Sequence, residues 1–160
     1  MACDMFLKLA GINGESADQS HKDEIDILAW SWGMSQSGTT HTGTGGGSGK
    51  VNVQDISVTK WVDKSSATLV QYCCKGTHIA DGLLTVRKAG DSPLEYIKVE
   101  MKDIIITSVS TGGSGGEDRL TENITLNFAQ FKMTYTPQAD TGAAGTAVEF
   151  GFDIRKNAPV

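Results

Sequence analysis

The chain has 160 residues, a length that fits one domain able to bury a sizeable core without a metal or a disulfide. Glycine occupies 19 positions and charged residues make up only 21%, so the modest apolar fraction of 39% indicates a strand-rich domain with glycine-loaded loops rather than disorder. The net charge of −5 argues against a nucleic-acid partner, and no apolar run is long enough to insert in a membrane.

The first predicted elements are two strands separated by a polar loop. Residues 5–9 form an apolar run, and residues 11–23 have loop composition. In residues 24–34 the side chains of odd and even positions differ in kind, which is the two-residue alternation of a strand. In this second strand Trp30 and Trp32 share one face and small residues occupy the other. The pattern predicts a strand that packs heavily on one side only.

A long polar segment and a third strand pattern follow. Residues 35–49 contain no apolar side chain, which indicates either a functional loop or disorder. Strand pattern resumes over residues 50–62, where the alternation slips in phase near Asp55 and predicts a β-bulge. One short helix is predicted between an N-cap at Asp63 or Ser65 and a glycine C-terminus at Gly76.

The second half of the chain reads as strands and loops. Strands are expected over 83–88, 96–101 and 104–110, the last two joined in a hairpin at Lys102-Asp103. A glycine-rich loop covers 111–118.

The longest alternating run extends to Tyr135 and reverses parity at Ala129-Gln130, which predicts a bulge that bends the strand round a barrel corner. After a loop over 138–146, a final strand places Val148, Phe150, Phe152 and Ile154 on one face. The pattern predicts an antiparallel β-barrel or sandwich with one helix.

The residues offer little support for catalysis or for a bound cofactor. The run TGTGGGSGK, which ends at Lys50, lacks the glycine spacing and the following helix of a phosphate-binding loop. His21, His41 and His78 fall in separate loop-like segments, and we expect solvated side chains. No GxSxG elbow singles out a nucleophile. We therefore predict no enzyme activity, no cofactor and no metal.

The cysteines give no disulfide framework. Cys3, Cys73 and Cys74 form no CxxC pair, and we expect free thiols. The N-terminal segment has no basic region and only a short apolar stretch, which predicts folding in the cytosol without a cleaved signal peptide.

Three stretches resemble the haemolysin-coregulated protein family, the tube subunit of bacterial type VI secretion systems. They are EIDILAWSWGMSQSG, GKVNVQDISVTKWVDKSS and STGGSGGEDRLTENITLNFAQ. The segments MACDMFLKLAGINGES, RKAG and FGFDIRKN are also similar to that family, so the likeness covers nearly the whole chain.

The resemblance implies a mainly β fold, an antiparallel β-barrel of two sheets with one short flanking α-helix, and a single tube-subunit domain over 1–160 without an appended toxin domain. It also implies hexameric rings that stack into a hollow tube. A contractile sheath would propel this tube from the cytoplasm, with a spike protein at its tip and effector proteins in its lumen. The subunit itself would be secreted to the medium or the target cell.

The resemblance also assigns roles to polar residues. Ring or stacking contacts are expected at Gln36, Ser37, Lys50, Asp55, Glu117, Asp118 and Arg119. Ser31, the one polar side chain on the small face of the tryptophan strand, is expected to face the lumen and contact cargo. The loop segments 37–48 and 141–146 match the family only as variable loops, which leaves the details of ring stacking open.

Two other classes of function remain open at this point. A monomeric ligand-binding barrel would need an apolar cavity, and few inward positions are unassigned. An enzyme would need a nucleophile or a metal constellation. The first would appear as a monomer stabilised by a small molecule, and the second as turnover of generic ester, peptide or glycan substrates.

Overall fold

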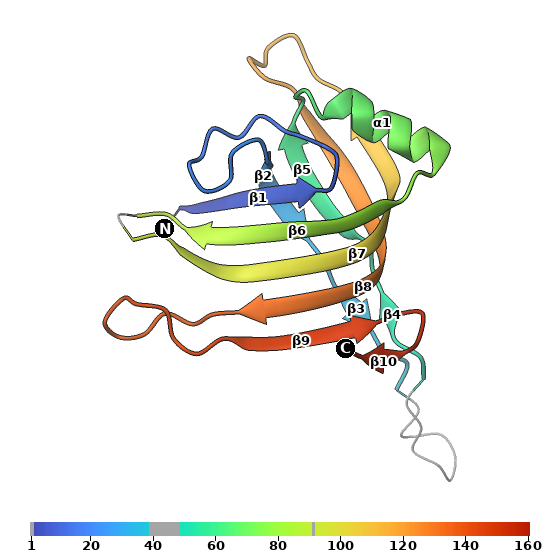
Figure 1. Cartoon of the computed structure of the whole chain (residues 1–160). Helices are drawn as coiled ribbons and strands as arrows, with labels where there is room; N and C mark the ends of the chain where they lie inside the picture. Colours follow the sequence, from blue (N-terminus) through green and yellow to red (C-terminus); the bar gives the residue numbers. More distant parts are fainter. Residues whose placement is uncertain (1, 39–48, 91) are drawn as a thin grey trace.

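The computed structural model describes residues 2–38, 49–90 and 92–160 (Figure 1). Its elements are β1 (Cys3–Leu9), β2 (Ile25–Ser31), β3 (Met34–Ser35), β4 (Asn52–Val53), β5 (Ile56–Trp61), α1 (Ser66–Lys75), β6 (Ile79–Lys88), β7 (Leu94–Thr111), β8 (Thr121–Tyr135), β9 (Val148–Asp153) and β10 (Ala158–Pro159). His41 and most of the glycine-rich run before Lys50 lie outside the described residues.

The strands form a closed antiparallel barrel with an added edge. One eight-stranded sheet has the order β10-β9-β8-β5-β2-β1-β6-β7, and β7 pairs again with β8. This second pairing closes the strands from β8 to β7 into a barrel, while β9 and β10 continue the sheet outside it (Figure 1). β3 and β4 pair as a separate two-stranded ribbon. The predicted barrel with one helix is confirmed.

Two long strands, β7 and β8, bend together and take part in both halves of the barrel (Figure 1). The buried residues of β8 occupy even-numbered positions up to Phe128 and an odd-numbered position at Phe131, the reversal that the sequence predicts. β7 changes parity at the same level, where Asp103 has a left-handed φ of 55°. The pairing passes this level in register, so the parity change reflects a shared bend rather than a one-sided bulge.

Two sequence predictions near turns are wrong. Lys102-Asp103 forms no hairpin, because β7 runs without interruption from Leu94 to Thr111. Asp55 marks no bulge within one strand: the chain ends β4 in the small ribbon and then enters the barrel as β5. A lone left-handed residue and a change of sheet both disturb alternation, and the local sequence does not distinguish them from a turn or a bulge.

The predicted tryptophan strand is also divided. β2 ends at Ser31, and the short β3 belongs to the ribbon. The pairing of β2 with β5 shifts between Ile27 and Ala29, so Ile27 points into the core while Ala29 and Ser31 are exposed. Trp30 then packs against the core, which gives the one-sided packing that we expected for this part of the strand.

The helix occupies the predicted segment. α1 has Ser65 as its N-cap and ends at Gly76, whose φ of 64° suits glycine and whose N–H donates to the Tyr72 carbonyl. Leu69 is its buried residue, and the helix packs against β7. α1 spans ten residues, and in the described ranges no helix has the length and apolarity needed to cross a bilayer.

A buried ion pair lies where the barrel meets the start of α1. Lys60 is 0% exposed and Glu122 is 1% exposed, and the Lys60 ammonium contacts the Glu122 carboxylate. Asp63 Oδ1 lies 3.1 Å from Lys60 Nζ, and the Ser66 hydroxyl donates to Glu122 Oε1 at 2.5 Å. Because a buried charge is costly unless it is paired, these partners depend on one another.

Candidate functional site

A face of the barrel built from β2, β5, β8 and the last part of β7 carries small hydroxyl side chains. Ser31 pairs with Ser57, Ser57 with Thr125, and Thr125 with Ser108. Directly paired residues of an antiparallel sheet project to the same side, so these four residues form one row across four strands. The adjacent pair Trp30 and Val58 points the opposite way, toward the core. We call the row, with Thr107 and Asp55, the hydroxyl face.

The hydroxyl face is held by a directed hydrogen-bond chain. Ser108 Oγ and Thr107 Oγ1 each lie 2.6 Å from Thr125 Oγ1, and Thr107 donates to Asp55 Oδ2 at 2.7 Å. Since each hydroxyl has one proton, donation toward Asp55 runs from Ser108 through Thr125 and Thr107. Asn127 Nδ2 also donates to Asp55, at 2.8 Å to Oδ1. Asp55, an expected assembly contact, therefore binds its own barrel on the same face as Ser31.

The other expected contact residues divide between opposite ends of β5. Gln36, Ser37 and Lys50 flank the loop near the start of β4 and β5, whereas the loop that contains Glu117 lies beyond the far end of β5 (Figure 1). The register agrees, because Trp61 at the end of β5 pairs with Thr121, the first residue of β8. The fold therefore separates the two groups rather than bringing them together.

The first of these ends has a tightly closed base. Gly49 N–H lies 3.4 Å from the Ser37 carbonyl oxygen. A Cβ at position 49 would lie 2.0 Å from Ser37 Oγ and 3.2 Å from Gln36 Oε1, so a larger residue there would require the Ser37 side chain to turn away. Lys50, the next residue, is exposed. This end therefore presents a cation beside a fixed loop base.

The second end presents carboxylates. The Arg119 guanidinium stacks over the Trp61 ring at 4.5 Å from its centroid, so this expected contact residue is held within its own chain. Glu117 and Asp118 are exposed, and the Glu117 N–H donates to the Ser114 carbonyl in a turn. This loop therefore presents two carboxylates beside the stacked Arg119.

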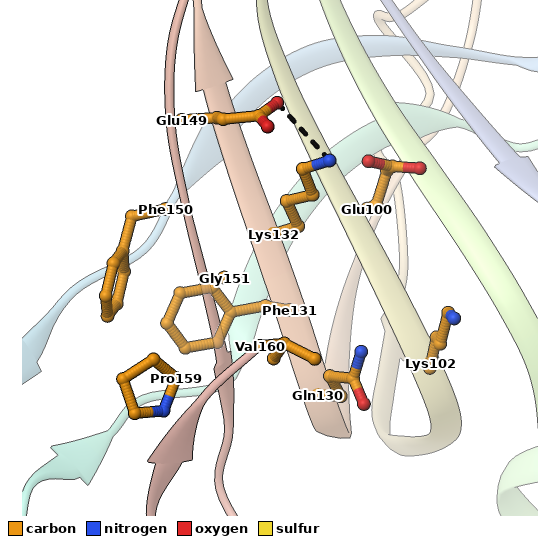
Figure 2. A pocket seen from close by; sticks show the side chains of 10 residues that line it. All are labelled: Glu100, Lys102, Gln130, Phe131, Lys132, Glu149, Phe150, Gly151, Pro159 and Val160. Carbon is orange, nitrogen blue, oxygen red and sulfur yellow. Dashed lines mark ion pairs between the residues drawn. The ribbon is translucent and has the colours of Figure 1, made fainter.

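β9 confirms the predicted strand as far as Asp153, with its alternating apolar residues on one face. Two of these side chains are nevertheless poorly covered, since Val148 is 69% exposed and Phe150 is 56% exposed. β9 is added to β8 outside the closed barrel, so no opposite strand covers these side chains. On the reverse face, a hollow of about 410 Å³ is lined by charged residues and by the chain end, with Glu149 Oε2 3.3 Å from Lys132 Nζ (Figure 2).

A buried histidine was not found by sequence reasoning. His21 is only 7% exposed, so its predicted solvation is wrong. Its ring stacks on Phe6 at 4.3 Å, with Nδ1 2.8 Å from Glu24 and Nε2 2.6 Å from Glu95. Burial raises the pKa of Glu95, but hydrogen bonds from His21 and Lys98 outweigh it and leave that pKa below its usual value.

A second buried group fixes the same loop to the barrel. Arg87 binds Asp18 through two nitrogens and also contacts Asp4 Oδ2 at 3.1 Å. The hydrogen bond from Arg87 is the main cause that lowers the pKa of Asp18 to about 2. The local sequence offers no signal for these pairs, because the partners lie far apart in the chain.

The remaining titratable residues of the described ranges suggest no further site. His78 is exposed, as predicted, and its Nδ1 lies 2.6 Å from Asp103 Oδ1. Cys3, Cys73 and Cys74 are free thiols. Within the described part of the chain, no three His, Cys, Asp or Glu side chains gather in a way that could hold a metal ion.

Comparison with known proteins gives one consistent family. Residues 6–135 match the family model described as "Type VI secretion system effector, Hcp". The chain is 58% identical over 159 residues to "Protein hcp1" of Pseudomonas aeruginosa, covering 98% of each. A crystal structure of Hcp1 from Salmonella typhimurium superposes with a TM-score of 0.82 at 35% identity over the full length of both chains. A structure of a type six secretion system protein superposes with a TM-score of 0.93 at 28% identity, over 99% of this chain and 100% of the other.

Proposed function

Because this chain belongs to the Hcp family of type VI secretion proteins, whose members are secreted and form rings, we propose that six copies close into a ring and that rings stack into a hollow tube. The tube would carry effector proteins in its lumen, a spike at its tip and a contractile sheath around it. In this role the subunit is a structural part and an exported product, and it performs no catalysis.

The observation that carries the stacking proposal is that the two groups of expected contact residues lie at opposite ends of β5. Lys50 shortly precedes β4 and the start of β5, whereas the loop between β7 and β8, which contains Glu117 and Asp118, lies beyond the far end of β5 (Figure 1). Unlike surfaces at opposite ends of a subunit make a heterologous contact, which repeats by translation instead of closing into a dimer. A cation at one end and carboxylates at the other would attract when rings stack head to tail.

The hydroxyl face supports the lumen assignment. Ser31, Ser57, Thr125 and Ser108 are small, uncharged and able both to donate and to accept hydrogen bonds. Such a surface can bind varied polypeptides without selecting one charge pattern. We propose that this face, with Ser31 and Asp55, lines the tube and contacts cargo.

The alternative of a ligand-binding barrel is disfavoured by the packed interior. Leu84, Val99, Met101 and Ile104 are fully buried in one apolar cluster that fills the barrel. The described hollows are instead open depressions of the outer surface, as Figure 2 illustrates for one of them.

Size-exclusion chromatography with light scattering and electron microscopy tests the proposal. We expect a ring of six 17.0 kDa chains, about 102 kDa, and stacked tubes at high concentration. Lys50→Glu should abolish stacking but keep the ring, and adding Glu117→Lys and Asp118→Lys should restore it. Lys22→Glu, at an exposed position in another loop, is the matched control. Unchanged stacking in Lys50→Glu would exclude these residues as stacking contacts, and a monomer at every concentration would argue against the ring.

A further inference from the structure

The exposed apolar part of β9 forms one surface with the β3–β4 ribbon. A groove of about 350 Å³ lies between them. Its apolar lining consists of Met34, Val51, Val53, Phe131, Phe150 and Phe152. Phe150 packs against Phe152 with ring centroids 6.2 Å apart, yet 56% of its surface is still exposed. We call this surface, together with Val148, the β9 groove.

The edge of the sheet beside the groove is only half covered. β10 pairs with Phe152 and Asp153, and the Val160 N–H donates to the Gly151 carbonyl. Val148, Glu149 and Phe150 extend beyond this pairing. A partly open edge with apolar side chains is a site where another chain can bind.

Uncharged polar residues border the groove. Gln36, Gly49 and Asn157 complete its lining beside the apolar side chains. An apolar centre with a polar rim is the usual composition of a protein–protein contact. The lining given by the described residues carries no charged side chain, which does not suit a nucleic acid or an anionic membrane.

We infer that the β9 groove is one half of the contact between neighbouring copies in the ring, so that its occupant is a second copy of this chain. The inference rests on the proposed ring. Two concave grooves cannot fill each other, so the contact is heterologous, as closure of a ring requires. The chain also carries apolar side chains elsewhere on its surface that could fill a neighbour's groove. These are Leu28, Val62, Val70 and Leu120.

The contact can be tested on the purified full-length chain by light scattering. Val148→Asp and Phe150→Asp each place a charge in a surface that would be buried between copies, while both side chains are more than half exposed in the single chain. We expect the double variant to shift from about 102 kDa to the 17.0 kDa monomer at micromolar concentration. Ala67→Asp, at an exposed position on α1, serves as the matched control and should leave the ring intact.

Circular dichroism and thermal melting establish that each variant is folded. Val148→Asp alone, at a 69% exposed position, provides a milder variant if the double substitution impairs folding. A folded β9 variant that still forms the ring would overturn the groove assignment and leave the ring itself supported. A wild-type chain that remains monomeric at all concentrations would overturn both the ring and this contact.

Discussion

The Arg87 guanidinium on β6 binds both carboxylate oxygens of Asp18, with Nη1 3.1 Å from Oδ1 and Nη2 2.5 Å from Oδ2. This geometry joins the loop between β1 and β2 to the outside of the sheet, where Arg87 also lies 5.1 Å over the Phe6 ring. Since His21 stacks on the same ring, two buried polar side chains of different elements cover Phe6. The loop is therefore part of the barrel's packing rather than a free surface segment.

Arg87→Met should destabilise the subunit. It leaves the Asp18 carboxylate without its partner and removes the cation over Phe6, and we expect a loss of about 1–3 kcal/mol in the free energy of unfolding, measured with urea. Arg155→Met is the control, because Arg155 is well exposed and its ion pair with Asp103 should contribute less than about 1 kcal/mol. Equal losses in both variants would contradict a special role for Arg87.

The Arg87–Asp18 pair should make the free energy of unfolding depend on pH. Arg87 lowers the pKa of Asp18 from its ordinary value of 3.8 to about 2, so the folded state favours the ionised carboxylate. This contribution is complete above about pH 4 and is lost as the pH falls through 2. Urea titrations between pH 5 and pH 2 should show a steeper loss of stability for wild type than for Asp18→Asn. Parallel curves would show that Asp18 does not supply this dependence.

The buried Lys60–Glu122 pair should show strong coupling. Lys60→Met alone leaves a buried carboxylate without its cation, and we expect a loss of about 3–5 kcal/mol. Lys60→Met with Glu122→Leu removes both charges and should recover much of that loss. Urea unfolding of the two single variants and the double variant measures the coupling. Additive losses would mean that the two side chains act independently.

Ser31→Gln tests the cargo role of the hydroxyl face. Ser31 is exposed at the end of β2, so a larger amide should alter contacts in the lumen without disturbing the core. We expect recovery of co-purified effector to fall several-fold while the ring keeps its mass. Ser92→Gln, in an exposed turn elsewhere, is the control. Cargo recovery equal to that of wild type would exclude Ser31 from the contact.

Residue pattern determined the elements of this protein. Alternation identified the strands, the parity reversal after Phe128 located the bend in β8, and Gly76 fixed the end of α1. These features are local, because the side chains that face one way along a strand or helix follow from its geometry. Resemblance to a family then supplied the tube function, which no spacing of these residues indicates by itself.

Tertiary structure decided what the alternating faces meet. Lys102-Asp103 could have been a turn, and only pairing with both neighbours makes it a bend in β7. His21 is buried where its ring stacks on Phe6 and meets Glu95, a residue far away in the chain. Alternation grouped Val148 with Phe150 but could not reveal that β9 lies outside the closed barrel. Parity depends on the backbone of one segment, whereas burial depends on segments that are distant in the chain.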